Sequence, residues 1–447
     1  MSLFKKIFFF LAVLFYAGIH SNAQQETTLP FLTWAPQAGY YDLTIKPDQY
    51  KTSVALPILG SLQFYYMNSG FRMSSMLNGS VIQPNNVIPE LKKINHLNTG
   101  ASIDLVNVRF HIKETFFQVS ARDVLTERFD YTHDLMNLIW NGNASYAGQT
   151  INLDNVRLAV NYYREYAVSA TRELNKKLTV GVRAKFLTGI ANISTRESES
   201  SLYTDPNGLS LTGNSQVTML SAGMINSKNI SGKDLMGLNN PGAAMDLGAR
   251  YKVSEKISIA CNVTNLGFIH YAGNVQNNVV NGNYTYSGYV MRDSASIVNA
   301  SWQNILDTLK SIFKPSQNSK AYNSWLSPTI YISGNYKITK NTMLYGSLAS
   351  SIYYGYHSTL TAGAVHSIGK TLQITMNYSI MANNYFNIGG GFVVRGGPAQ
   401  LFLTCDNLPA FFEPMNVKYF NVRTGINLVF GKTDSAKETS KNIFKKS

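Results

Sequence analysis

Basic side chains recur at alternate positions within apolar segments of this sequence, and they are the residues best suited to bind a ligand. In residues 178–186 every second residue is apolar, and Arg183 and Lys185 stand between the apolar positions. If the segment is a strand, both basic groups lie on one face. A guanidinium fork or an ammonium group on that face can bind a carboxylate or a phosphate. By this alternation the candidate binding residues are Arg109, Arg157, Arg183, Lys185, Asp246, Arg250 and Arg423, and Lys113, Arg122 and Arg395 share the placement.

Asp246 is the acid that the alternation places with these bases, so something else must offset their mutual repulsion. Acids of the N-terminal segment, such as Asp42 and Asp48, are one explanation, together with water and salt. An anionic ligand held by the guanidinium groups is the other. The sequence leaves both open.

No sequence motif points to catalysis. The chain has no G-x-S-x-G, H-E-x-x-H, H-x-H or C-x-x-C motif, and these spacings position nucleophiles or metal ligands. His111 beside a serine of another strand is a pair that folding could still assemble, although a histidine lining a polar interior is the simpler interpretation. We therefore expect no enzyme, no cofactor and no metal site.

Alternation with a period of two recurs in segments of about ten residues separated by turn residues, which is typical of a transmembrane barrel. The sequence predicts an all-β fold, a transmembrane antiparallel β-barrel of about fourteen strands with an N-terminal hatch-like segment and short loop helices. The expected strands are 51–68, 99–113, 115–124, 153–169, 176–190, 242–253, 256–271, 325–337, 341–355, 357–368, 371–383, 386–396, 398–406 and 416–430.

Short and long connections alternate between these strands, so the short turns fall on one side, which we expect to be periplasmic together with both chain ends. Residues 208–222 are assigned to a long outer loop, because one extra crossing would put every later turn on the wrong side. Apolar residues at helical spacing predict short helices at 297–313 and 126–140, packed on the rim or serving as a lid or docking element.

The chain divides into four segments. Residues 1–23 resemble a cleaved secretory signal peptide, with an N-terminal membrane anchor as the alternative. Residues 24–50 are a hatch or a periplasmic extension, 51–430 are the outer-membrane barrel, and 431–447 are a flexible basic periplasmic tail.

Composition agrees with this organisation. Aromatic residues make up 12% and charged residues 14% of the chain, against about 25% charged residues in a typical soluble domain. The net charge of +14 fits a basic lumen or contact with acidic lipid headgroups, and no motif supports nucleic-acid binding. Cys261 and Cys405 fall on apolar strand faces and are expected to be free, lipid-facing thiols, with a disulfide as the alternative.

Paired-strand motifs carry a family resemblance. Residues 242–251 (GAAMDLGARY) and 257–267 (ISIACNVTNLG) resemble the signature of Bacteroidetes-type outer-membrane barrels, which are similar to the long-chain fatty-acid transporter (FadL-like) fold. Residues 56–61 (LPILGS), 68–71 (NSGF) and 405–407 (CDN) resemble one uncharacterised Bacteroidetes family of this kind. The resemblance covers nearly all of the chain after residue 23 and implies fourteen strands with an N-terminal hatch.

Two functions are consistent with these features. The first is a passive channel or transporter for small hydrophobic or anionic amphipathic molecules, with the N-terminal segment as its gate. The second is a non-conducting interaction barrel, a partner or shuttle of an outer-membrane protein secretion system. The expected partners are outer-membrane lipid, a small amphipathic or anionic ligand, and an outer-membrane or secretion-system protein.

Overall fold

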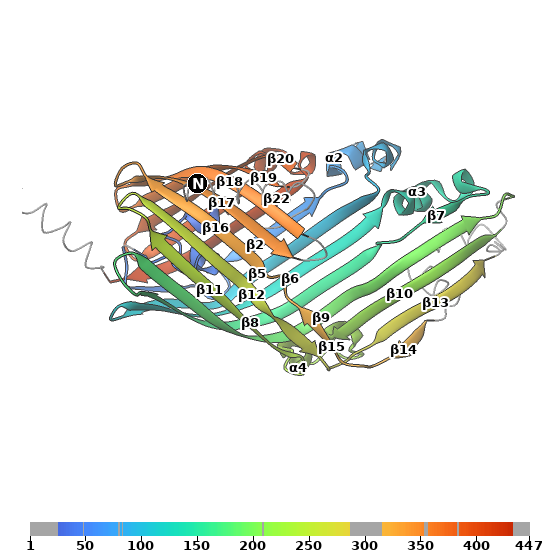
Figure 1. Cartoon of the computed structure of the whole chain (residues 1–447), viewed down its shortest axis with the longest axis horizontal. Helices are drawn as coiled ribbons and strands as arrows, with labels where there is room; N and C mark the ends of the chain where they lie inside the picture. The colour runs from blue at the N-terminus through green and yellow to red at the C-terminus, as the bar shows by residue number, and fades with distance from the viewer. Residues whose placement is uncertain are drawn as a thin grey trace, which may run out of the picture.

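The computed structural model of this chain describes residues 26–431 except 48, 79–80, 83, 208–209, 287–314, 353–355 and 382–383. Its strands form one closed antiparallel barrel with fourteen strand positions around the wall (Figure 1). The barrel closes where β22 pairs with β1 and β2, which in turn pair with β5. The wall consists of β1 (Thr52–Ala55) with β2 (Leu62–Asn68), β5 (Ile94–Ile112), β6 (Thr115–Thr132), β8 (Arg157–Glu173), β9 (Leu178–Thr204), β11 (Pro241–Lys252), β12 (Ile257–Tyr271), β16 (Thr329–Lys337), β17 (Thr342–Ile352), β18 (Tyr356–Ile368), β19 (Leu372–Met381), β20 (Asn384–Gly396), β21 (Ala399–Cys405) and β22 (Tyr419–Phe430).

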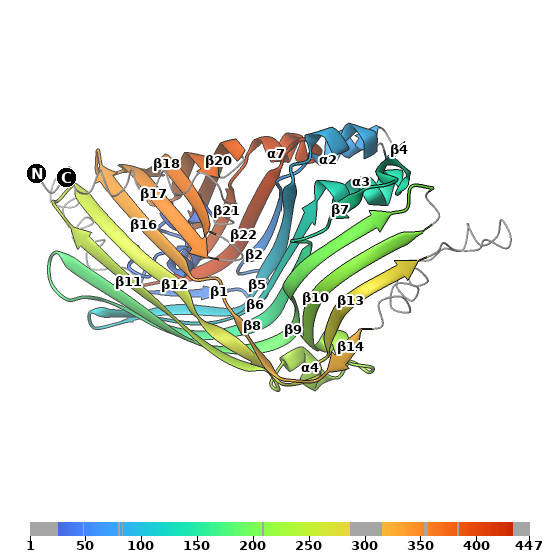
Figure 2. The same cartoon turned by 45° about the vertical axis from the view of Figure 1, so that its right-hand side comes forward.

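The predicted fourteen-stranded barrel is confirmed. Tight turns such as residues 113–114 and 397–398 gather at one end of the barrel, which we call the turn end. The long connections gather at the opposite end, the loop end, where some strands extend farther than others (Figure 2). The loop-end strands are β3 (Leu77–Asn78), β4 (Val81–Ile82), β7 (Thr150–Asn152), β10 (Leu211–Gly223), β13 (Asn277–Tyr286), β14 (Ser316–Asn318) and β15 (Tyr322–Trp325). The described helices are α2 (Met73–Met76), α3 (His133–Asn141), α4 (Gly232–Met236) and α7 (Pro409–Phe412), and the 3-10 turns are η2 (Leu29–Phe31), η3 (Pro36–Tyr40), η4 (Pro84–Asn86), η5 (Ile88–Glu90), η6 (Ala144–Tyr146), η7 (Met224–Asn226) and η8 (Pro414–Asn416).

The first predicted strand, 51–68, is divided into β1 and β2 by a bulge at residues 56–61. Pro57 has no N–H to contribute to a ladder, and Ile58 has a φ of 67°, which is uncommon for a branched residue. The Ile58 N–H donates to the Asp104 carbonyl at 2.9 Å, so the bulge stays attached to β5.

The longest strand, β9, continues past the barrel wall at the loop end. Residues 178–188 of β9 pair with β11 in the wall, whereas residues 191–204 pair with β10. Residues 211–223 therefore form a strand of a sheet beyond the barrel and not an additional crossing. This sheet continues through β13 to β14.

The predicted helix at 126–140 is wrong in its first half. Residues 126–132 continue β6 and pair with β5 and β8 on either side, so two ladders satisfy the backbone groups that a helix would satisfy internally. The helix α3 begins only after Thr132, whose hydroxyl accepts from the Leu135 N–H at 3.1 Å and caps its first turn. The predicted helix at 297–313 lies outside the described residues.

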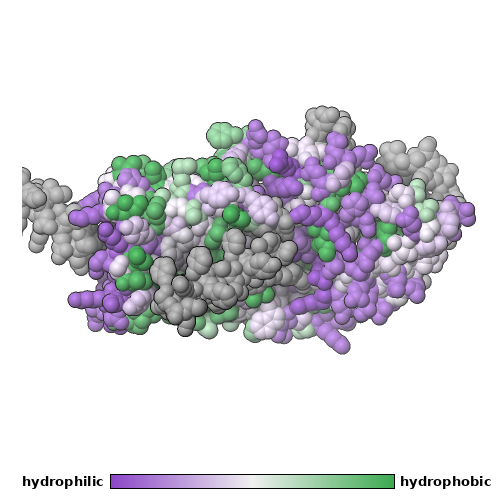
Figure 3. Space-filling model, turned by 45° about the horizontal axis from the view of Figure 1, so that its top comes forward, coloured by the Kyte–Doolittle hydropathy of each residue, from purple (hydrophilic) through white to green (hydrophobic). Residues whose placement is uncertain are grey.

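The two faces of the barrel wall differ in polarity. Apolar side chains such as Val168, Val182, Phe186, Met245 and Met376 are exposed on the outside, and hydrophobic surface lies between two more polar ends (Figure 3). The inward positions are mostly polar and buried, as in β19, where Gln373, Thr375, Asn377 and Ser379 alternate with the outward residues. An apolar exterior around a polar interior is the arrangement of a membrane-spanning barrel. Among the described helices, none is long and apolar enough to span a membrane.

The cysteines are both free, and they differ in exposure. Cys261 is exposed on the outer face, as expected, but Cys405 is buried. The chain after β21 turns back across that face, since the Leu408 N–H bonds to the Ile388 carbonyl at 2.7 Å and the Leu408 side chain lies over Gly390, which pairs with Cys405. The prediction that Cys405 faces lipid is therefore wrong.

Met376 lies at the middle of β19 and is 62% exposed. A substitution at this position tests whether the outer face contacts lipid or water. We expect Met376→Arg to lower the free energy of unfolding by about 2–4 kcal/mol, the cost of an arginine near the bilayer midplane. Urea-dependent refolding into lipid vesicles measures this loss, with Met376→Leu as the control. If the two variants are equally stable, the outer face does not lie in lipid.

Candidate functional site

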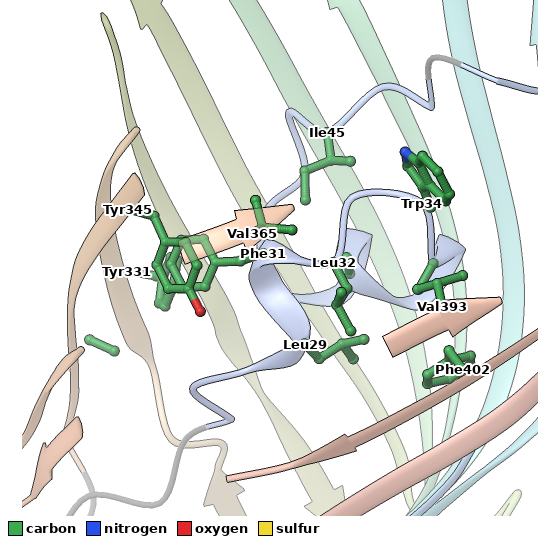
Figure 4. Close-up of a cluster of buried hydrophobic side chains, with 13 residues drawn as sticks. Leu29, Phe31, Leu32, Trp34, Ile45, Tyr331, Tyr345, Val365, Val393 and Phe402 are labelled. Atoms are coloured by element: carbon green, nitrogen blue, oxygen red, sulfur yellow. The ribbon is translucent and has the colours of Figure 1, made fainter. Parts of the chain in front are cut away.

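Residues 26–47 and 49–50, which we call the hatch, lie inside the barrel (Figure 4). Asp48, the other acid expected to offset the bases, lies outside the described residues. They form the two short turns η2 and η3, each with a proline in its first turn, where the fixed φ of proline suits a turn and its missing N–H is no loss. Phe31 stacks on Tyr345 of β17 with ring centroids 3.5 Å apart. Leu32 and Trp34 belong to the same buried cluster as residues of β18, β20 and β21. The hatch thus has an apolar core of its own with one side of the wall.

The opposite side of the wall forms hydrogen bonds with the hatch backbone at Leu43. The Leu43 N–H donates to Asn262 Oδ1 at 3.1 Å, and its carbonyl accepts from the Thr171 hydroxyl at 2.5 Å. A Cβ at Gly181 would stand 2.7 Å from both the Leu43 carbonyl oxygen and the Leu43 Cβ. Glycine at 181 therefore lets the hatch approach the wall this closely.

Charged groups anchor the hatch along its length. Arg423 of β22 donates to Glu26 Oε1 at 2.7 Å and to the Ser61 hydroxyl at 2.7 Å. Arg250 of β11 donates to the Asp42 carboxylate and, at 2.9 Å, to the Thr44 hydroxyl. These contacts bring carboxylates of the hatch to bases of the wall, which is the electrostatic compensation that a buried charge requires.

Two further anchors use backbone groups of the hatch. Arg109 of β5 donates to the Ile45 carbonyl. The Asp406 carboxylate, after β21, accepts the N–H groups of Thr27 and Thr28 at 3.2 and 3.0 Å. Main-chain atoms at both ends of the hatch are therefore held by charged side chains of the barrel.

A second group of charges lies within the wall, and we call it the ionic cluster: Arg122, Glu165, Arg183, Lys185 and Asp246. Lys185 lies between two acids, with its Nζ 2.9 Å from Asp246 and 3.3 Å from Glu165. Arg183 contacts Asp246 at 3.2 Å, and Arg122 forms a two-pronged contact with Glu165 at 3.1 Å. The cluster also touches the hatch, since Arg183 donates to the Gly39 carbonyl at 2.6 Å and the Arg122 guanidinium lies 4.5 Å from the Tyr40 ring centre.

The candidate residues predicted from alternation thus separate into groups. Arg183, Lys185 and Asp246 come together in the ionic cluster, whereas Arg109, Arg250 and Arg423 each contact the hatch at a different point. Arg157 lies away from both groups, at the loop-end start of β8 opposite Asp130. Whether any of them binds a ligand remains a prediction.

Alternation in the sequence also placed Arg122, Lys113 and Arg395 on the inward face. Arg122 is inward, as expected. Lys113 is exposed in the turn between β5 and β6, with a φ of 53°, because the strand ends one residue before it. Arg395 lies at the turn end, where its Nε donates to the Gly397 carbonyl at 3.1 Å.

Alternation missed Glu165, the second acid of the ionic cluster, and Glu26 of the hatch. The alternation of β8 itself is unbroken, because the extra residue of the register shift at Tyr162/Tyr163 lies in β9, at Ile190. With tyrosines at adjacent positions, the sequence around Glu165 shows no clear apolar face. For Glu26 no periodic signal exists, because the hatch has no strand.

A cavity of about 240 Å³ lies against the hatch. Its floor includes Glu26, Tyr40 and Tyr41, and its wall comes from the loop-end halves of the strands, as with Asn98 of β5 and Thr126 of β6. The lining combines aromatic rings with amide and charged groups: Tyr65, Tyr163, Trp325, Tyr331, Tyr419, Asn161, Asn265, Asn421, Arg122 and Lys185. Apolar surfaces with a few oriented polar groups are typical of sites for small organic ligands. Within the described residues, no cluster of histidine, cysteine and carboxylate side chains could hold a metal ion.

A closed barrel with an apolar exterior, a polar lumen and an internal hatch defines the class of outer-membrane β-barrels. Within that class, the chain belongs to the "Family of unknown function (DUF5723)", which matches residues 45–406. No curated protein matches its sequence.

Solved structures with a similar architecture are distant in sequence. The toluene transporter TbuX of Ralstonia pickettii has 9% identity and a TM-score of 0.44, covering 93% of this chain and 99% of that one. A FadL homologue of Pseudomonas aeruginosa has 8% identity and a TM-score of 0.43, with 92% and 99% covered. The toluene transporter TodX of Pseudomonas putida has 9% identity and a TM-score of 0.41, with 92% and 95% covered. Likeness at this level carries no argument about the function of this chain.

Asp246 is the counter-charge for both Arg183 and Lys185, and its carboxylate is fully buried. We expect Asp246→Asn to cost about 3–5 kcal/mol of unfolding free energy, because it removes the carboxylate partner of the buried Arg183 guanidinium and one of the two carboxylates beside Lys185. Glu114→Gln is the matched control, since it breaks an exposed pair with Arg172 at 3.1 Å that contributes at most about 1 kcal/mol. Urea unfolding in micelles measures both, and equal small losses would show that the ionic cluster is not dry.

Proposed function

We propose that this barrel is a passive outer-membrane channel for small amphipathic molecules, with the hatch as its gate. The observation that carries the proposal is the cavity directly on the hatch. Tyr40 and Tyr41 of the hatch form part of its floor, so a molecule in the cavity contacts the element that blocks its passage.

The orientation follows from the two ends of the barrel. Outer-membrane barrels have short turns on the periplasmic side and long loops outside. With the tight turns in the periplasm, the cavity lies on the external side of the hatch. A periplasmic position of both chain ends, which lie outside the described residues, belongs to the same proposal. Export by a cleaved signal peptide at residues 1–23 is part of the same proposal.

The chemistry of the cavity suggests the class of its ligand. Tyr65, Tyr163 and Trp325 offer aromatic surface to an apolar body, and Arg122 and Lys185 lie at its border. Both cations also contact Glu165, so the site is mildly basic rather than strongly so. An organic molecule with an apolar body and one anionic or polar group fits this lining.

An interaction barrel is the second candidate. The observation in its favour is the sheet of β9, β10 and β13, which continues beyond the wall at the loop end. A partner or shuttle role in protein secretion would use this external surface and would not need the hatch to move.

Gly181→Val tests the gate, because the added side chain would occupy the space of Leu43. In proteoliposomes we expect this variant to take up naphthalene-1-sulfonate at least about tenfold faster than the wild type, since an activation barrier lowered by about 1.4 kcal/mol has that effect. Gly334→Val is the matched control, because a Cβ at Gly334 meets nothing within 4 Å. A chain without residues 26–50 serves as a second open form.

Uptake equal to that of empty vesicles in both the Gly181→Val protein and the hatch-deleted protein would contradict the channel. If a protein partner co-purifies in stoichiometric amount with these non-conducting forms, the interaction barrel replaces it.

A further inference from the structure

The helix α7, after β21, lies on the lipid-facing side of the barrel at the loop end. Phe411 packs edge-on against Phe420, with ring centroids 6.0 Å apart and planes at 90°. Phe420 is an outward residue of β22, because its neighbours Tyr419 and Asn421 are the buried, inward ones. The apolar outer belt therefore continues onto α7, where Phe412 is 87% exposed.

Basic side chains border this aromatic surface. Lys418 precedes Phe420 by two residues on the outward side, and its Nζ donates to the Gly70 carbonyl at 2.8 Å. That bond ties the start of β22 to the loop carrying Arg72 and α2, and α2 contacts η8 just after α7 (Figure 2). Arg72 and Lys92 of this loop are both exposed.

The charges near Lys418 do not cancel. Burial lowers the pKa of the Lys418 ammonium; Glu90 opposes this effect, whereas Arg72 and Lys92 add to it. The carboxylates of Glu90 and Glu413 accept from the neutral Ser75 hydroxyl at 3.1 Å and the Asn416 amide at 2.7 Å and keep their charge, so three bases stand against two acids. An anion beside Lys418 would relieve the repulsion among the three bases.

We propose that Arg72, Lys92 and Lys418, together with Phe411 and Phe412, form a rim patch that binds the phosphates of lipid A in the outer leaflet. Aromatic side chains at the edge of the apolar belt hold the acyl-chain region, and basic groups just beyond them meet the headgroup. Only the external leaflet carries this diphosphorylated glycolipid, so the assignment rests on the orientation given under the proposed function. Transport through the lumen is separate, because the rim patch lies outside the barrel.

Binding of diphosphoryl lipid A to the full chain in detergent, measured by native mass spectrometry, tests the patch. We expect the double variant Arg72→Gln/Lys92→Gln to bind about thirty-fold more weakly, since each basic side chain near a membrane surface contributes roughly a factor of five. Lys176→Gln/Lys177→Gln is the matched control, because it removes the same charge from an exposed turn at the other end. Phe412→Ser, which leaves every charge in place, should also weaken binding.

Equal binding by the double variant and the control would overturn the rim patch. Wild-type binding of phosphatidylglycerol as tight as that of diphosphoryl lipid A would overturn the choice of lipid A. A weaker signal with monophosphoryl lipid A supports contact with both phosphates. Naphthalene-1-sulfonate uptake by the same variants should stay at the wild-type rate, so failure here is distinguishable from failure of the channel.

Discussion

Charge compensation among buried side chains of the lumen is the constraint on which this structure depends. Arg183, Arg250 and Arg423 project inward from three wall strands, and a buried cation is costly unless a carboxylate and hydrogen-bond acceptors surround it. The wall supplies Asp246 and Glu165, and the hatch supplies Asp42, Glu26 and carbonyl groups. The position of the hatch and the basic residues of the lumen therefore depend on each other, because the hatch carries part of the charge that compensates those residues.

This arrangement limits how a gate could work. A ligand shifts a conformational equilibrium only by the difference in its affinity for the two states. Expelling the whole hatch would break the buried ion pairs Arg423–Glu26 and Arg250–Asp42 together, more than a small molecule in a 240 Å³ cavity can offset. A local rearrangement near Tyr40 and Tyr41, with the anchors at Arg423 and Arg250 kept, requires much less energy.

The wall could be predicted from the sequence because each crossing repeats the same two-residue pattern, and the even strand number follows from it. Prediction was wrong where long-range pairing decides the conformation, as in residues 126–132, which extend β6, and at Cys405, which a later segment covers. Glu165 was missed because aromatic and charged residues stand on both faces of β8 around it, so the sequence there shows no clear apolar face. The cavity could not be predicted, since Tyr65, Tyr163 and Tyr331 meet only when distant strands and the hatch are in place.

Hydrogen–deuterium exchange of the hatch amides in the detergent-solubilised full chain tests the central claim most directly. The N–H groups of Leu32, Ala38 and Asp42 bond within the hatch, and those of Thr28 and Leu43 bond to the barrel. Because the hatch is buried in the lumen, we predict that these amides exchange as slowly as those of the strands β19 and β22. Complete exchange of these residues within seconds would contradict a hatch held in the lumen by the charges of the wall.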